Sequence, residues 1–122
     1  MKRLFAISLC ALALVGCQTE DKDKFSRQIQ INSVPDGAQI IMDGFKLGKA
    51  PIYVGVETNE VGCFVRKTMI TAIPQKDSYH TQVISFPPFN ANDPDKSTAP
   101  ESITFYMERN PVDGNSVILN ED

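Results

Sequence analysis

Residues 31–44 read Ile-Asn-Ser-Val-Pro-Asp-Gly-Ala-Gln-Ile-Ile-Met-Asp-Gly, and this stretch decides the fold. On each side of Pro-Asp-Gly at residues 35–37, apolar and polar residues alternate, which is the pattern of a strand with one buried face. Proline presets φ and glycine accepts a positive φ, so these three residues predict a turn. The Asp-Gly pair at residues 43–44 is typical of a hairpin turn. The stretch therefore predicts one strand over residues 27–32 and a second over residues 38–43.

Further extended segments follow, at residues 52–56, 64–73, 79–86 and 103–107. Segment 64–73 is the longest and carries apolar residues on both faces, which predicts a central strand. Residues 90–100 are rich in Pro, Asn, Asp and Ser and predict a long loop. No helical period runs through the chain after residue 26. Short strands separated by turns predict an all-β fold, a small antiparallel β-sandwich.

The turns of the first half read Pro35-Asp36-Gly37-Ala38, Asp43-Gly44 and Gly48-Lys49-Ala50-Pro51. Together they resemble the PEGA domain, a family named for a Pro-Glu-Gly-Ala turn, over residues 31–56. The resemblance implies a small β-sandwich on an extracytoplasmic bacterial protein, used for binding or spacing, with no catalytic residue and no cofactor to carry over. After residue 56 the chain departs from the family pattern. A sandwich that shares these turns by chance is the alternative.

The N-terminus has the form of a secretory signal peptide. A lysine and an arginine at residues 2–3 precede an apolar run over residues 4–16. The run is too short for a membrane-spanning helix, which takes about 20 residues. It ends in Leu-Val-Gly-Cys at residues 14–17, which resembles the bacterial lipobox. The resemblance implies cleavage between Gly16 and Cys17 and attachment of lipid to Cys17, and two or more acyl chains anchor a protein stably in a membrane. An ordinary signal peptide with a chance cysteine is the alternative.

These features predict four parts of the chain: a signal peptide (1–16), the lipidated Cys17 with a flexible polar tether (17–26), a PEGA-like β-sandwich domain (27–110) and a C-terminal tail (111–122). Within the tail, the apolar residues 117–119 either add an edge strand or fray. Gln18 follows the cysteine, where an aspartate would favour retention in the inner membrane. We therefore expect the periplasmic side of the outer membrane.

The charge balance argues against nucleic acid as a partner. The chain has 12 basic and 15 acidic residues, and removal of the signal peptide takes away two basic residues and no acidic one. The mature chain then has 10 basic and 15 acidic residues, a net charge of −5. Nucleic-acid-binding proteins instead concentrate positive charge on one face.

The residues that carry catalysis or bind metal are sparse. His80 is the single histidine and has no second histidine or cysteine at the spacing of metal ligands. Residues 93–95 lack the ligand pattern of a calcium loop, and no Gly-x-Ser-x-Gly motif occurs. Cys63 is the one cysteine left after cleavage and lipidation, so no intramolecular disulfide is possible. We expect a small buried side chain there, with a reactive thiol as the alternative. The sequence predicts no enzyme, no metal and no cofactor.

Phe86, Pro87, Pro88 and Phe89 are the most unusual residues of the mature chain. They predict an exposed apolar surface for another envelope protein or a glycan. Alternatively, Phe86 is the last core residue of its strand and Phe89 covers a sheet edge. Three functions remain open: a binding or spacing module that uses residues 86–100, a glycan or peptidoglycan binder, and an enzyme centred on His80. The second requires a concave face lined by tyrosine, and the candidates are Tyr53, Tyr79 and Tyr106.

Overall fold

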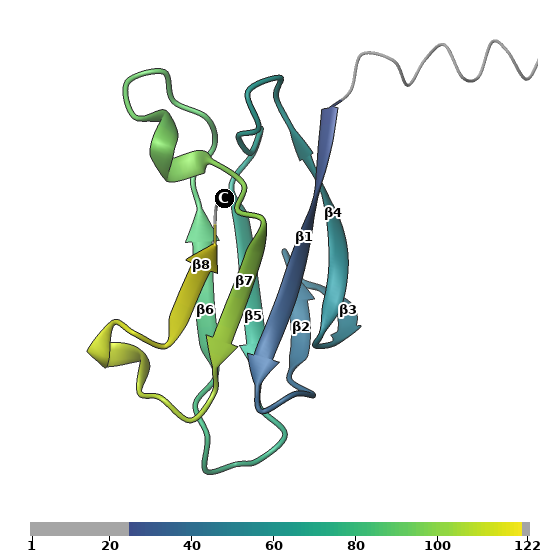
Figure 1. Cartoon of the computed structure of the whole chain (residues 1–122), viewed down its shortest axis with the longest axis vertical. Coiled ribbons are helices and arrows are strands. Elements are labelled where there is room, and N and C mark those ends of the chain that lie inside the picture. Colours follow the sequence, from purple (N-terminus) through teal and green to yellow (C-terminus); the bar gives the residue numbers. More distant parts are fainter. Residues whose placement is uncertain (1–24, 121–122) are drawn as a thin grey trace, which may run out of the picture.

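The computed structural model describes residues 25–120, which fold into two facing β-sheets (Figure 1). The strands are β1 (Phe25–Val34), β2 (Gln39–Met42), β3 (Phe45–Lys49), β4 (Ile52–Thr58), β5 (Thr68–Ile73), β6 (Gln82–Phe86), β7 (Ser102–Tyr106) and β8 (Val117–Asn120). Two short 3-10 helices, η2 (Pro94–Ser97) and η3 (Pro111–Asp113), lie in the connections. The expected signal peptide, the cleavage point at Gly16, the lipid attachment at Cys17 and most of the expected tether lie outside the described residues.

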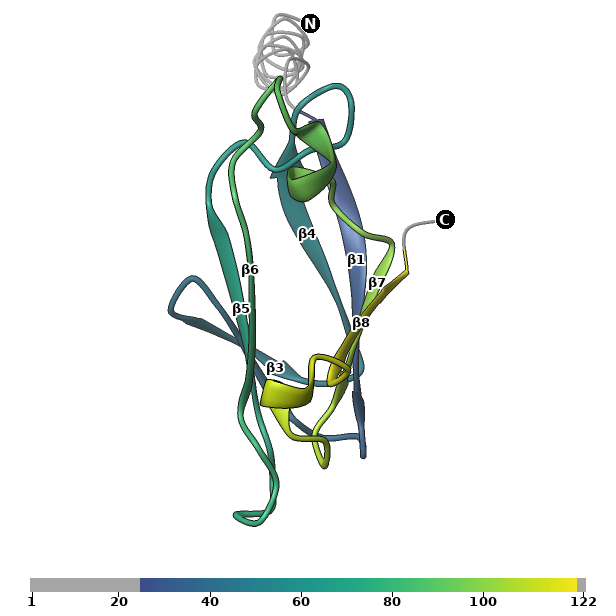
Figure 2. The ribbon, with the colours of Figure 1, turned by 90° about the vertical axis from the view of Figure 1, so that its left-hand side faces the viewer.

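The first sheet has the strand order β4-β1-β7-β8 and the second has the order β3-β2-β5-β6. The first sheet lies in front of the second in Figure 1, and Figure 2 shows both from the side. Neighbouring strands are antiparallel except β1 and β7, which run parallel with Ile31 opposite Ile103. The architecture confirms the predicted all-β sandwich. It also confirms β5 as a central strand, because β5 lies between β2 and β6.

Alternate residues of both sheets fill the space between them. In β1, Ile29 and Ile31 are fully buried, whereas Gln28 faces solvent. The fully buried apolar residues of the other strands are Ile40, Ile70, Ala72, Ile103 and Phe105. Burying a large apolar side chain contributes about 1.5–3 kcal/mol, so this shared core holds the two sheets together.

The turn between β1 and β2 depends on Ser33 and on Gly37. Ser33 is buried, its hydroxyl donates to the Pro35 carbonyl at 2.8 Å, and it accepts from the Ala38 amide at 3.2 Å. Gly37 has a φ of +104°, and a Cβ there would lie 2.7 Å from Nε2 of Gln75. The turn therefore favours glycine at this position for its backbone conformation, and the end of the Gln75 side chain would have to shift if a Cβ were present.

The strands of the sandwich end at two opposite sides of the molecule, which differ in their connections. The loop end holds the start of β1, the β4–β5 loop (residues 59–67) and the β6–β7 loop (residues 87–101), at the top of Figure 1. The turn end lies at the opposite end of the strands and holds the β1–β2, β5–β6 and β7–β8 connections.

The structure differs from the sequence-based expectations in local details. β3 was not predicted, because its side chains are exposed or half-buried throughout and show no alternation. Residues 64–67 and 79–81 were predicted as strand and lie in loops. Their backbone amides bond elsewhere: the Phe64 amide donates to the Ser97 carbonyl and the His80 amide to the Met107 carbonyl. Of the two alternatives for residues 117–119, the edge strand is correct, since β8 pairs with β7.

Candidate functional site

The two loops of the loop end form one hydrogen-bonded unit. The Phe64 amide donates to the Ser97 carbonyl at 2.8 Å, and the Ala99 amide donates to the Gly62 carbonyl at 2.9 Å. The Phe89 amide donates back to the Phe64 carbonyl, also at 2.9 Å. These bonds cross between the loops in both directions, so the backbones of the two loops are held in fixed relative positions.

The predicted surface at residues 86–89 divides into a buried and an exposed part. Phe86 is 4% exposed and stacks on Phe64, so it belongs to the core, as the alternative interpretation held. Pro87, Pro88 and Phe89 are exposed and line a shallow hollow of about 480 Å³ with Asn90, Ala91, Asp93 and Lys96. The exposed part of the predicted surface is therefore the segment after β6.

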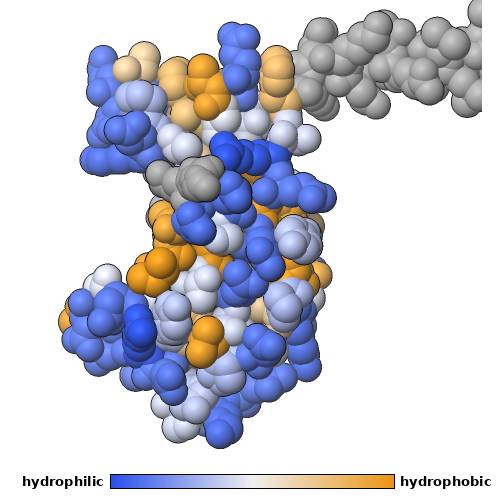
Figure 3. Space-filling view, viewed as in Figure 1, coloured by the Kyte–Doolittle hydropathy of each residue, from blue (hydrophilic) through white to orange (hydrophobic). Residues whose placement is uncertain are grey.

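Three further apolar residues are exposed at the loop end and were not singled out from the sequence. They are Phe25 at the start of β1 and Val61 and Val65 in the β4–β5 loop. Figure 3 shows hydrophobic residues among hydrophilic ones at this end of the molecule. No local signal separates Val61 and Val65 from core residues, because they flank the buried Cys63 and Phe64 in one apolar segment. We call Phe25, Val61, Val65 and Phe89 the apolar loop-end group.

Charged side chains of both signs surround this group. Arg66 forms an ion pair with Glu57, and Lys96 lies 3.3 Å from Asp93. The side chains of both cations are more than two-thirds exposed. The loop end therefore has exposed apolar side chains with charges of both signs near them. Its surface is not dominated by charge of one sign.

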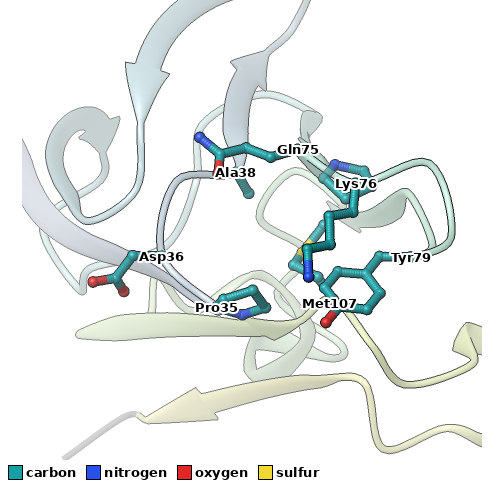
Figure 4. Close-up of a pocket in the computed structure, with 8 residues that line it drawn as sticks. Pro35, Asp36, Ala38, Gln75, Lys76, Tyr79 and Met107 are labelled. Carbon is teal, nitrogen blue, oxygen red and sulfur yellow. The ribbon is translucent and has the colours of Figure 1, made fainter.

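A second candidate site lies at the turn end. A pocket of about 230 Å³ is lined by Pro35, Asp36, Ala38, Pro74, Gln75, Lys76, Tyr79 and Met107 (Figure 4). Ala38 and Met107 are each 1% exposed and supply apolar atoms to its lining. The Lys76 ammonium lies 5.5 Å from the centre of the Tyr79 ring, a cation–π contact. In Figure 4 the Lys76 ammonium lies toward Pro35 and Tyr79, whereas the Asp36 carboxylate points away from them.

The three candidate tyrosines do not share one site. Tyr79 lines the turn-end pocket, but Tyr53 is 66% exposed on edge strand β4. Tyr106 is half-buried, with the Arg109 guanidinium 4.0 Å from its ring centre. Of the three tyrosines that the glycan hypothesis proposes, Tyr79 is therefore the one that lines the turn-end pocket.

His80 and Cys63, the other residues considered as candidates for chemistry, line neither the turn-end pocket nor the hollow at the loop end. His80 is exposed, and its side chain makes no hydrogen bond or ion pair within residues 25–120. Cys63 is 2% exposed, with Sγ 3.6 Å from the Pro94 carbonyl, which fits the expected small buried side chain. Across the described part of the chain, no three His, Cys, Asp or Glu residues gather as a metal site would require. Nor does any helix in residues 25–120 have the length and apolarity needed to span a bilayer.

Comparison with known proteins agrees with the first half of this fold. The family model of the PEGA domain matches residues 26–61, from the second residue of β1 into the loop after β4. No curated protein and no solved structure matches the chain. The family match supports a PEGA-like domain that includes β1 to β4, and the strands after residue 61 complete the two sheets.

Proposed function

We propose that the chain is a lipid-anchored, non-catalytic module of the bacterial cell envelope, which binds or spaces another envelope component. The apolar run over residues 4–16 and the lipobox-like residues 14–17 support the anchor. The PEGA-like β1–β4 region supports a binding or spacing role rather than catalysis. Gln18, next to the anchored cysteine, favours the outer membrane facing the periplasm.

The direction of β1 is the observation that carries the proposal. β1 begins at Phe25 at the loop end, only eight residues after Cys17. Eight residues span at most about 28 Å, even when fully extended. A lipid on Cys17 therefore keeps the loop end near the bilayer and presents the turn end to the periplasm.

The anchor is tested by intact mass and by detergent partitioning of the full chain expressed in a Gram-negative host. We expect a mature chain that begins at Cys17, carries the added mass of the acyl groups and enters the detergent phase. Cys17→Ala removes the acceptor sulfur and should abolish both the added mass and the partitioning. Cys10→Ala is the matched control and should change neither. A mature chain without added mass contradicts the proposal.

Glycan binding at the turn-end pocket is a second candidate, because Tyr79 lies there beside apolar and polar groups. The pocket combines an aromatic ring with the amide of Gln75 and the ammonium of Lys76. Mixed apolar walls with a few polar groups are typical of small-ligand sites, and 230 Å³ suits a single sugar ring rather than a longer chain.

Saturation-transfer NMR with soluble peptidoglycan fragments tests this candidate. We expect saturation transfer to the sugar protons, lost in Tyr79→Ala and kept in the control Tyr53→Ala, whose tyrosine lies outside the pocket. Equal transfer in both variants would exclude the pocket as the binding site.

A further inference from the structure

We propose that the loop end is itself a membrane-contacting surface, in which the apolar loop-end group enters the interfacial layer of the bilayer that holds the anchor. The inference rests on the proposed lipid anchor at Cys17 and goes beyond it. The anchor alone keeps the loop end near the bilayer but leaves the tilt of the strands free, whereas a contacting surface holds the strands at a steep angle to the bilayer.

Exposure of the apolar loop-end group is the first argument. The exposed fraction is 66% for Val61, 49% for Phe25, 42% for Phe89 and 40% for Val65. These residues come from three separate segments that the fold brings to one end. Apolar side chains at several neighbouring loop tips are a common mark of an interaction surface, since water-exposed loops usually carry polar residues.

The position of the chain identifies the bilayer as the partner. Phe25 is itself a member of the group, and it lies eight residues after the proposed lipidation site. Within the reach of about 28 Å, the surface that meets the loop end first is the lipid layer. A lipid layer also needs no shape complementarity, which suits four side chains on three separate segments.

The charges around the group fit lipid headgroups. Arg66 and Lys96 are exposed and paired with Glu57 and Asp93, so this rim carries both signs. Binding should then depend on transfer of apolar side chains and only weakly on anionic lipid or on salt, unlike the binding of polybasic segments.

The rigidity of the loop end favours insertion. The hydrogen bonds that link Phe64 to Ser97 and to Phe89 hold the β4–β5 loop against the β6–β7 loop. A loop backbone that is already held in place loses less conformational entropy on contact than the backbone of a free loop.

A single-tryptophan experiment tests the proposal, because the chain contains no tryptophan. Phe89→Trp and Val61→Trp place a reporter in the apolar loop-end group, on different loops. Val112→Trp is the matched control, since Val112 is 88% exposed and lies in η3 at the turn end. Each lipidated mature variant is reconstituted into phosphatidylcholine vesicles, with and without brominated acyl chains, and its emission is recorded.

We expect the reporters at positions 61 and 89 to shift to the blue and to be quenched by brominated lipid, and the reporter at position 112 to do neither. Water-like, unquenched emission at positions 61 and 89 overturns the proposal, and so does equal quenching at all three positions. The intact mass of the same samples separates the two failures. If lipid is present without quenching, the anchor stands and the contact is wrong, whereas absence of lipid removes the anchor and the contact together.

Discussion

Phe64 and Phe86 stack with their ring centres 4.8 Å apart and an angle of 27° between the ring planes. Phe64 comes from the β4–β5 loop and Phe86 is the last residue of β6, so the stack joins the loop end to the second sheet. Both rings are buried, Phe64 to 1% and Phe86 to 4% exposure. The stacked rings of Phe64 and Phe86 therefore form part of the buried core beneath the exposed residues of the loop end.

Truncation of this stack should cost much of the folding free energy. Phe86→Ala removes a buried ring from the core, and we expect a loss of about 3–5 kcal/mol in the free energy of unfolding. Urea denaturation followed by far-UV circular dichroism measures the loss. Phe45→Ala is the control, because Phe45 is 73% exposed on edge strand β3, and its effect should stay within about 0.5 kcal/mol. Similar losses in both variants would refute the assignment of Phe86 to the core.

Substitution of Gly37 should reveal the constraint on the β1–β2 turn. Gly37→Ala combines a positive φ with a contact to Gln75, and we expect a loss of about 1–3 kcal/mol in unfolding free energy. Adding Gln75→Ala should restore the part of the loss that comes from the contact. Gly55→Ala is the control, since a Cβ there meets nothing within 4 Å. A neutral Gly37→Ala variant would contradict the described turn.

Gln82 offers a test with a defined dependence on pH. It is 1% exposed, and its Nε2 donates to the carbonyls of Arg109 at 2.9 Å and Tyr106 at 3.4 Å. In Gln82→Glu the ionised carboxylate would be buried against carbonyl oxygens, so folding should raise its pKa above the unfolded value of about 4.3. The unfolded chain then releases this proton at lower pH than the folded chain, and stability falls as the pH rises above about 4.3.

We therefore expect Gln82→Glu to lose about 2 kcal/mol more at pH 7 than at pH 4, measured as urea unfolding free energies relative to wild type at each pH. Gln28→Glu is the control, because Gln28 is exposed on β1 and its carboxylate would stay in water. A loss in Gln82→Glu that is the same at both pH values would show that position 82 is open to solvent.

The Cys63 thiol should be protected in the folded protein. Its side chain is 2% exposed and contacts the Pro94 carbonyl, so a bulky aromatic disulfide reagent has no direct path to the sulfur. We expect slow labelling of native protein, at a rate limited by opening of the loop end, and fast labelling in denaturant. Fast labelling of native protein would instead favour the reactive-thiol alternative for Cys63.

The parts of the fold that the sequence predicts are those with local signals. Proline and glycine at residues 35–37 mark the first turn, and alternation in β1, β4 and β7 marks strands with one buried face. β3 carries no such signal, since pairing with β2 rather than burial makes it a strand. The parallel pairing of β1 with β7 joins segments about 70 residues apart, and no local pattern encodes it.

The candidate site was predictable only in part for the same reason. Phe86 and Phe89 stand out in the sequence, but the sequence does not show that Phe86 is buried and Phe89 exposed. That difference depends on Phe64, which lies in the β4–β5 loop, stacks on Phe86 and accepts a hydrogen bond from the Phe89 amide. Val61 and Val65 become part of a candidate surface only because the fold places their loop at the loop end, together with Phe25 and Phe89. The turn-end pocket combines three connections, so Tyr79 alone gave no indication that Pro35 and Met107 would lie beside it.

The antiparallel pairing of β8 with β7 has a practical consequence for imaging and labelling. Asn120 lies opposite Ser102, the first residue of β7, so β8 runs back toward the loop end. In the proposed membrane-contacting orientation, an epitope tag placed after Asn120 would lie nearer the lipid headgroups, where antibodies have poor access. A tag inserted at Val112 in the β7–β8 connection would project from the opposite side. Comparing antibody access to the two tags on intact vesicles would report the orientation of the whole domain.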